Sequence, residues 1–300
     1  MDKQRSMQIS AQIGNIIASR APKIKYSPSD LKKAEKSIGK DGLEEMREIG
    51  LLGDDFELFY VIREFCSEIG LGDVADGDYI IDLFKNAKKL DAFEFEADPY
   101  ITAANIPTVV SGDITLTCAE YARGEIFQYD MPDLAAKIVT PRLGFFDRGV
   151  SFPSIYQGEI PWMSVCPSEI YSMREPIAAA HGRVLVLGLG LGYYPFMISR
   201  KAEVESIVIV ELQQSIADIF NAHILPHFEH GDKLKVITAD AIAYMEGVKD
   251  GDFDFCFADI WEGAVDGAEA YKKLRPYEKK LPHTEFAYWI EEQIKAYLEE

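Results

Sequence analysis

Residues 183–192 read Arg-Val-Leu-Val-Leu-Gly-Leu-Gly-Leu-Gly, and this stretch decides the fold. The continuously apolar run Val184–Leu187 is typical of a strand buried on both faces of a parallel sheet, and Tyr193–Arg200 predicts the crossover helix after it. Three glycines at alternate positions end the run: Gly188, Gly190 and Gly192. Glycine permits a positive φ or a close approach of backbone to a ligand. Because the first N–H groups of a helix are free, this turn predicts a site for a carboxylate, ribose or phosphate.

The spacing of these glycines separates two classes of nucleotide ligand. A dinucleotide fingerprint reads G-x-G-x-x-G, but counting from Gly188 places Tyr193 at its third glycine. An NAD-dependent oxidoreductase is therefore the least favoured hypothesis. The G-x-G-x-G of this chain instead resembles motif I of the class I S-adenosylmethionine-dependent methyltransferases.

Three later segments each place an acidic residue after an apolar run. Ile207–Val210 ends in Glu211, Lys235–Thr238 is followed by Ala239-Asp240-Ala241, and Phe253–Ala258 ends in Asp259. A carboxylate at Glu211 can bind both hydroxyls of a ribose. Taken alone, each acid is better explained as a strand-end residue that caps the following helix. The four runs together favour a ligand of the S-adenosylmethionine type.

The resemblance assigns roles to these positions. It implies that Gly188, Gly190 and Gly192 cradle S-adenosylmethionine, that Glu211 holds the ribose, and that Asp240 and Ala241 lie against the adenine. It also places Asp259 beside the reactive centre. Methyl transfer needs mainly in-line alignment of the nucleophile, the methyl group and sulfur. An amine nucleophile must arrive unprotonated, and Asp259 is our candidate to hold it or to accept its proton.

Within that superfamily, residues 183–259 look most like the spermidine synthase branch. The spacing from Glu211 to Asp240 to Asp259 and the later Thr284-Glu285-Phe286 resemble its pattern. Two positions depart from it. The aminopropyltransferases carry an acidic residue inside the glycine loop, where this chain has leucines, and a Ser/Thr-Asp-Pro-type segment where this chain has Ile260–Gly263. Methyl transfer to a small molecule or protein is therefore the first hypothesis, and aminopropyl transfer from decarboxylated S-adenosylmethionine is the second.

The expected fold class is α/β, a Rossmann-like doubly wound parallel sheet of the class I methyltransferase type. A complete fold of this type has seven strands, but residues 260–300 contain no obvious buried strand. Thr284 can cap a helix that carries Phe286, Trp289 and Ile294 on one face. Either the C-terminal strands are missing, through truncation or divergence, or another segment or chain completes the sheet. A third hypothesis follows, a nucleoside-binding relative without catalytic activity.

The expected domains are a helical N-terminal domain over residues 1–95, a β-rich segment over 96–175 and a Rossmann-like domain over 176–300. Asp54-Asp55 opens a helix with Phe56, Phe59 and Ile62 on one face, closed by Gly70. A second helical stretch carries Ile80, Leu83 and Phe84. Turn signals separate strand-like runs at 114–118 and 125–129.

Composition limits the partners. The chain has 300 residues, of which 48% are hydrophobic, so a folded core is expected. Its formal net charge of −19 argues against binding to a nucleic-acid backbone and is compatible with a cationic acceptor, although an acidic surface also serves solubility. No segment is apolar enough to span a bilayer, and no signal peptide is evident. We expect a cytoplasmic protein with free thiols; the sequence leaves a homo-oligomer open.

Two local clusters have competing interpretations. His223, His227 and His230 fall at near-helical spacing, but Pro226 interrupts the helix between them, so we predict no metal site. Trp162, Glu169 and Tyr171 precede the first Rossmann strand, where related enzymes bring a substrate-facing segment over the site. Ordinary packing explains them at least as well.

Overall fold

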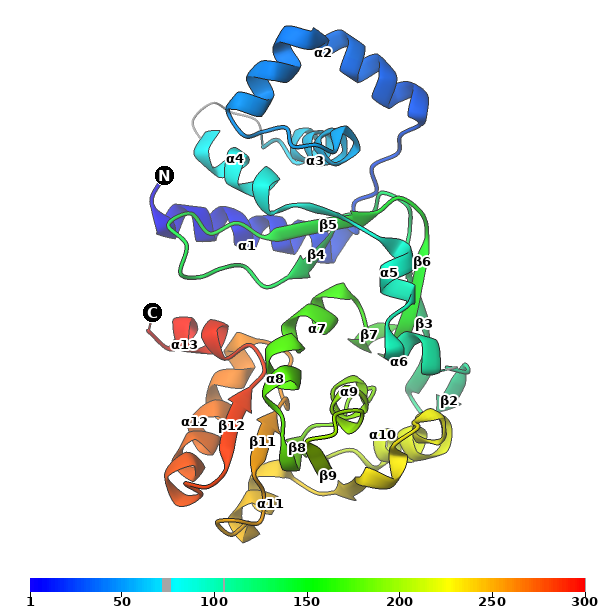
Figure 1. Ribbon diagram of the computed structural model, residues 1–300, viewed down its shortest axis with the longest axis vertical. Coiled ribbons are helices and arrows are strands. Elements are labelled where there is room, and N and C mark those ends of the chain that lie inside the picture. Colours follow the sequence, from blue (N-terminus) through cyan, green and yellow to red (C-terminus); the bar gives the residue numbers. More distant parts are fainter. Residues whose placement is uncertain (72–76, 105, 300) are drawn as a thin grey trace. The chain divides into compact units, whose positions relative to one another are not determined.

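The computed structural model describes residues 1–71, 77–104 and 106–299. The chain forms two compact units (Figure 1), one of Met1–Glu96 and Glu120–Ser151 and the other of Ala97–Ala119 and Phe152–Glu300. This division differs from the three expected segments. The β-rich stretch is shared between the units, because some of its strands pair with a strand from the N-terminal part and the others form a sheet of their own.

Helices dominate the first unit. Its helices are α1 (Lys3–Arg20), α2 (Pro28–Glu48), α3 (Phe56–Glu68), α4 (Gly77–Asn86) and α5 (Ala92–Glu96). The carboxyl group of Asp55 accepts the N–H groups of Glu57 and Leu58 and so caps α3, as the sequence predicts. Phe59, Ile62 and Phe65 of α3 are buried in the core of this unit.

A three-stranded sheet completes the first unit. The strands are β1 (Lys88–Leu90), β4 (Phe127–Asp130) and β5 (Arg142–Phe146), in the order β1-β5-β4. β1 runs parallel to β5, and β4 runs antiparallel to it. Tyr79 and Leu83 of α4 and Phe145 of β5 are fully buried in the core.

A small antiparallel sheet belongs mainly to the second unit. Its strands are β2 (Val109–Ser111), β3 (Ile114–Tyr121), β6 (Val150–Gln157) and β7 (Ile160–Ser164), in the order β2-β3-β6-β7. The first unit includes only the last two residues of β3 and the first two of β6. The short helices α6 (Pro99–Ala103), α7 (Pro167–Ser172) and α8 (Arg174–Ala179) also belong to the second unit.

The principal element of the second unit is a five-stranded sheet in which all neighbours are parallel. Its order is β10-β9-β8-β11-β12. The strands are β8 (Gly182–Leu187), β9 (Val204–Glu211), β10 (Leu234–Thr238), β11 (Phe255–Ala258) and β12 (Glu285–Tyr288). Val184, Leu185, Val186 and Leu187 are fully buried, as their continuous apolar run predicts.

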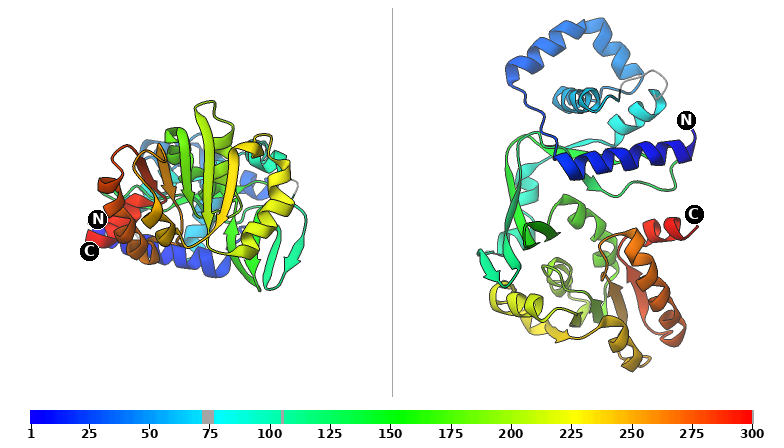
Figure 2. Two further views of the ribbon diagram at one scale, coloured as in Figure 1. Left: turned by 90° about the horizontal axis from the view of Figure 1, so that it is seen from below. Right: turned by 180° about the vertical axis from the view of Figure 1, so that it is seen from behind.

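Helices connect these strands, and one more follows the last of them. They are α9 (Tyr193–Ser199), α10 (Gln214–Ile219), α11 (Ala241–Gly247), α12 (Ala264–Lys280) and α13 (Glu291–Glu299). Figure 2 shows α12 and α13 beside each other, and α12 also packs against β12. The alternation of strand and helix around a parallel sheet confirms the expected α/β, Rossmann-like fold class. Among the described residues, no helix combines the length and apolar character that a membrane crossing requires.

The C-terminal part differs from the sequence-based expectation. Residues 285–288, expected to continue a helix, form a fifth strand that pairs in parallel with β11, Phe255 lying opposite Glu285 and Ala258 opposite Tyr288. The Thr284 hydroxyl donates to the Phe253 carbonyl instead of capping a helix. The expectation was wrong because a four-residue edge strand is too short to show a period, so nearby apolar residues of α13 suggested helical spacing.

The strand order creates a natural crevice. From β8 the chain adds β9 and β10 on one side and β11 and β12 on the other, so the order reverses between β8 and β11. Open parallel sheets bind ligands outside the carboxyl ends of the strands at such a reversal. Gly188 and Asp259, which follow β8 and β11, stand at this point.

We expect Ala287→Pro to destabilise the second unit. The N–H of Glu285 donates to the carbonyl of Asp254, just before β11, and that of Trp289 to the carbonyl of Ala258. By the alternation of a ladder, the N–H of Ala287 also faces β11. Proline would remove that donor, at a cost of about 2 kcal/mol. Thermal unfolding should show a lower midpoint than in wild type. Ala287→Ser keeps the N–H group and is the control; equal midpoints for both variants would contradict the pairing.

Candidate active site

A cavity of about 1070 Å³ lies at the carboxyl ends of the parallel strands. One residue at or just beyond the end of each of the five strands lines the cavity. These residues are Asp240 after β10, Glu211 at the end of β9, Gly188 after β8, Asp259 after β11 and Trp289 after β12. The cavity therefore brings together most of the expected site residues, including Gly190 and Ala241. Gly192 is not among its lining residues.

The glycine loop needs glycine for backbone reasons. Gly188, Gly190 and Gly192 all have positive φ, at +96°, +55° and +79°. A Cβ added at Gly188 would overlap the backbone oxygen of Asp259, and one at Gly192 would overlap the ring of Phe220. Gly190 is less restricted, since its added Cβ would lie 3.3 Å from the flexible Met163 thioether. Gly188 thus permits the contact between the ends of β8 and β11, whereas Gly192 permits the packing of the loop on Phe220.

Residues just before and within α6 hold the glycine loop from outside. The hydroxyl of Tyr100, a fully buried residue, donates to the carbonyl oxygen of Leu191. The hydroxyl of Tyr193 donates to the Asp98 carboxyl group at 3.2 Å, and Asp98 also caps α6 through the N–H groups of Tyr100 and Ile101. Sequence reasoning missed these positioning residues. The only local signal is the helix-capping pattern Asp98-Pro99, which says nothing about a partner more than ninety residues away.

Glu211 joins the glycine loop to β9. Its carboxyl group accepts the N–H of Leu189 at 3.1 Å through one oxygen and the N–H of Gln213 at 2.8 Å through the other. Burial raises the pKa of this carboxyl group, and the backbone donors oppose that rise. Each oxygen can accept more than one hydrogen bond, so both keep capacity for a ligand's hydroxyl groups.

Asp240 caps the helix that follows it, which is one of the two roles that the sequence suggests, and it also lines the cavity. One carboxyl oxygen accepts the N–H of Ala243 at 2.8 Å, which caps α11. Ala241 is buried beside it. Two aliphatic residues that sequence reasoning did not select, Leu212 and Ile242, line the same part of the cavity. The side chain of Leu212 is notable because 65% of its surface is exposed immediately after a buried strand.

Asp259 and Glu169 form a pair of carboxyl groups in the cavity wall. Burial raises the pKa of Asp259 well above its ordinary value, and the charge of Glu169 raises it further. Burial raises the pKa of Glu169 to about 7. Among the described residues, neither side chain has a hydrogen-bond or ion-pair partner. Two desolvated acids without a counter-cation are typical of functional sites rather than of structural ion pairs.

The three tryptophans of the chain all line this cavity: Trp162, Trp261 and Trp289. The indole N–H of Trp261 donates to the backbone oxygen of Trp289, and the indole N–H of Trp289 donates to the Ser172 hydroxyl. These bonds fix two of the rings. Indole faces attract cations, and the effect grows when the cation is desolvated.

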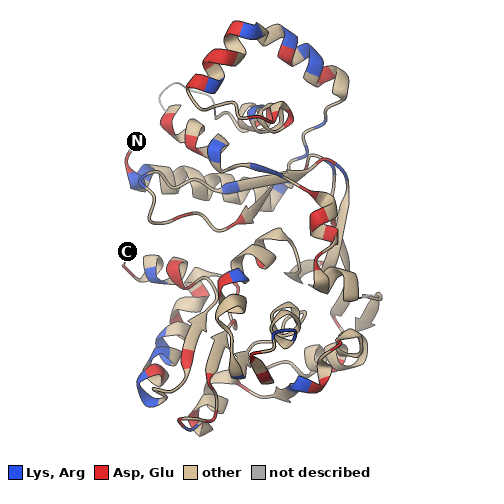
Figure 3. Cartoon of the chain, in the orientation of Figure 1, with Lys and Arg blue, Asp and Glu red and all other residues tan. Residues whose placement is uncertain are grey.

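Every charged residue described in the cavity wall is acidic. Six carboxylic residues line it: Glu169, Glu211, Asp240, Asp259, Glu262 and Asp266. No Lys, Arg or His is found among its described lining residues. Basic residues occur elsewhere, for example on α2 and α12 (Figure 3). The site is therefore suited to a positively charged ligand, and anions such as a pyrophosphate would be repelled.

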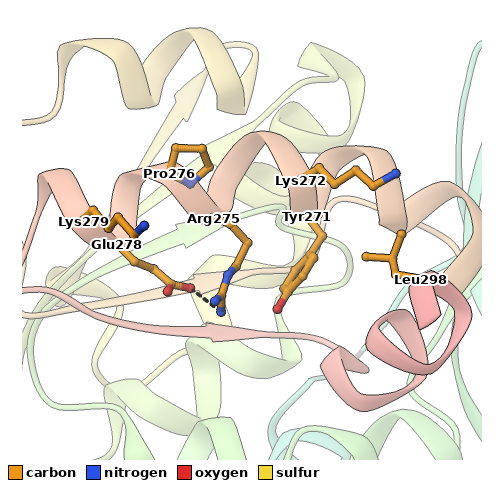
Figure 4. Close-up of a pocket in the computed structure, with 7 residues that line it drawn as sticks. All are labelled: Tyr271, Lys272, Arg275, Pro276, Glu278, Lys279 and Leu298. Carbon is orange, nitrogen blue, oxygen red and sulfur yellow. Dashed lines mark ion pairs between the residues drawn. The ribbon is translucent and has the colours of Figure 1, made fainter.

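A second, smaller hollow of about 430 Å³ lies on α12 (Figure 4) and differs in character. Its wall includes Lys272, Arg275 and Lys279, and Arg275 forms an ion pair with Glu278 at 3.1 Å. Its wall also includes Leu298 of α13, and it contains none of the expected site residues. We assign no ligand to it.

The histidine cluster lies outside the cavity wall. His223 lies in a π-helical turn, Phe220–Ile224, and His227 in a 3-10 turn, Leu225–His227. Within the described part of the chain, no group of three or more His, Cys, Asp or Glu side chains is arranged to hold a metal ion.

Comparison with known proteins finds similarity only among solved structures. No family model matches the chain, and no curated protein matches it. A candidate O-methyltransferase from Klebsiella pneumoniae has 18% identity and a TM-score of 0.26, with 33% of this chain and 43% of that chain covered. Spermidine synthase from Thermotoga maritima has 15% identity and a TM-score of 0.33, with 44% of this chain and 46% of that chain covered.

A third solved structure, precorrin 8w decarboxylase from Methanobacterium thermoautotrophicum, has 18% identity and a TM-score of 0.29, with 39% of this chain and 59% of that chain covered. The matched part of this chain thus spans less than two thirds of each of these proteins. Similarities of this size carry no argument about activity. The fold assignment rests on the order and pairing of the strands.

The glycine loop gives a matched pair of variants. Gly188→Ala introduces a side chain that overlaps backbone, so we expect it to lower the free energy of unfolding by about 3 kcal/mol or more. Gly190→Ala meets only the flexible Met163 and should cost about 1 kcal/mol. Chemical denaturation of the two variants measures the difference. Equal stability would show that β8 and β11 do not approach as described.

The carboxyl group of Glu169, a half-buried residue whose pKa burial raises, should make stability depend on pH. Its pKa is about 7 in the folded protein against an ordinary 4.5, so its contribution to stability is fully present below pH 4.5 and is lost as the pH rises through 7. Glu169→Gln should therefore become more stable relative to wild type by about 3 kcal/mol between pH 4.5 and 8. Denaturation at several pH values measures this. The exposed Glu159→Gln is the control, and a pH-independent difference for Glu169→Gln would refute the assignment.

Proposed function

We propose that this chain is an S-adenosylmethionine-dependent transferase that moves the methyl group to an amine-bearing, cationic acceptor. One cavity carries the proposal. In its wall the glycine loop, Glu211 and Asp240 lie together with Glu169 and Asp259, whose carboxyl groups have no hydrogen-bond or ion-pair partner among the described residues. The described lining residues include no basic side chain.

The residues present fit the nucleoside. Glu211 has two carboxyl oxygens with free acceptor capacity for ribose hydroxyls. Asp240 can accept a hydrogen bond from the adenine amino group, while the aliphatic side chains of Leu212 and Ile242 supply an apolar surface for the ring. The exposed position of Leu212 supports this role, because an exposed leucine in a concave site gains by covering an apolar ligand.

The other half of the cavity fits an amine. Glu169 and Asp259 can hold an ammonium group by charge-assisted hydrogen bonds, and the rings of Trp162, Trp261 and Trp289 add cation–π attraction. The pKa of Glu169, about 7, matches what a proton acceptor near neutral pH requires, and the pKa of Asp259 is also raised by burial. Sulfonium bound here would supply an activated methyl group. The chain's own contribution is to align the amine, remove its proton and exclude water.

A second function is favoured by a specific observation. The carboxylate of S-adenosylmethionine has no basic side chain to pair with among the described lining residues, and decarboxylated S-adenosylmethionine lacks that group. Aminopropyl transfer is therefore the alternative. Against it, Leu189 and Leu191 occupy the loop positions where the resembling family carries an acid. The non-catalytic alternative, which rested on the lack of strands five to seven, loses part of its support, since the fifth strand is present and brings Trp289 to the cavity.

Calorimetric titration with S-adenosylmethionine tests the proposal. Wild type should bind, and Glu211→Gln should bind about tenfold more weakly, since tenfold corresponds to about 1.4 kcal/mol, the lower end for a hydrogen bond to a charged group. The control is Glu205→Gln, which alters an exposed acid on the same strand outside the cavity. Unchanged affinity in Glu211→Gln would remove the nucleoside site, and stronger binding of the decarboxylated form by wild type would favour aminopropyl transfer.

A further inference from the structure

The strand order determines which acids face which part of a bound nucleoside. Along the carboxyl edge of the sheet, Asp240, Glu211, Gly188 and Asp259 follow one another, because β10, β9, β8 and β11 are neighbours in that order. If Asp240 meets the adenine and Glu211 the ribose, the next group along the edge lies over Gly188 and Asp259. In S-adenosylmethionine that group is the sulfonium.

The acidic residues expected beside adenosine and those expected beside sulfur differ in their hydrogen-bond partners. Glu211 accepts two backbone N–H groups and Asp240 accepts one. These donors compensate part of the negative charge at the adenosine end. Asp259 and Glu169 have no such partner among the described residues. The two carboxyl groups without a compensating donor therefore lie beside the expected position of sulfur, where a cationic sulfur favours their ionised forms.

Methyl transfer removes the positive charge at that position. The lone pair of the acceptor forms the new bond to the methyl carbon, the carbon–sulfur bond breaks, and its electron pair stays on sulfur as a neutral thioether. The proton of the methylated amine passes to one of the two carboxylates. Donor and nucleoside product thus differ at sulfur by one unit of charge and one methyl group, and they share every contact with Glu211 and Asp240.

Resting on the proposed function, we propose that Asp259 and Glu169 make this site selective for the cationic donor, so that it binds S-adenosylmethionine at least tenfold more tightly than S-adenosylhomocysteine. The two carboxyl groups attract the positively charged sulfonium before transfer, and they make no comparable interaction with the neutral thioether of the product. A cavity wall with basic residues or compensating hydrogen-bond donors near sulfur would not favour the sulfonium over the thioether in this way. Product release is thereby coupled to the loss of charge.

The experiment is a calorimetric titration of the full chain with S-adenosylmethionine, S-adenosylhomocysteine and adenosine at low salt. We expect the first to bind at least tenfold more tightly than the second, and the difference to shrink at high salt because screening weakens charge interactions. In Asp259→Asn and Glu169→Gln the ratio of the two affinities should fall toward one, with the affinity for adenosine retained. Glu205→Gln should keep the wild-type ratio.

The outcomes separate this inference from the proposed function. Equal affinities in wild type, or tighter binding of S-adenosylhomocysteine, overturn the charge selection while leaving a nucleoside site in place. Failure of all three ligands to bind overturns the proposed function and this inference with it. An unchanged ratio in both acid variants would show that selectivity does not come from Asp259 and Glu169. The wild-type ratio remains informative even if a variant does not fold.

Discussion

The close approach of the backbones at Gly188 and Asp259 is the constraint on which the rest of the second unit depends. The N–H of Asp259 donates to the carbonyl of Leu187, and the missing side chain at Gly188 lets the two strand ends pass without overlap. This contact lies where the strand order reverses, so it brings the turn after β8 and the turn after β11 to one cavity. The glycine loop and Asp259 face a common ligand because of it.

The cavity illustrates a conflict between stability and binding. Burying Glu169 and Asp259 without cationic partners disfavours their ionised forms, as their raised pKa values show. A folded protein gains nothing from such a pair by itself. A cationic ligand relieves the conflict, since it restores the ionised state and receives the field of both groups. The aromatic rings of the three tryptophans act in the same direction.

The main sheet was largely predictable because local sequence signals dominate it. The apolar run at 184–187 is fully buried, and so are Ile207, Ile209 and Val210 of the run at 207–210, so composition alone reveals both strands. The fifth strand was missed because Glu285–Tyr288 is short, lies at the edge and carries no continuous apolar run. Its identity as a strand comes from pairing with β11, a contact that no local pattern encodes. The division into two units was likewise missed, because β1 pairs with a strand more than fifty residues away.

The sequence by itself determined the nucleoside half of the candidate site. Its residues follow apolar strands directly, so their position at the carboxyl edge follows from the alternation of strand and helix. Only the tertiary structure decided the other half. Glu169 and Trp162 come from segments before β8, and Trp289 comes from the end of β12. Their meeting with Asp259 depends on packing between distant segments, and their chemistry depends on burial and on which charges are near, quantities that exist only in the folded chain.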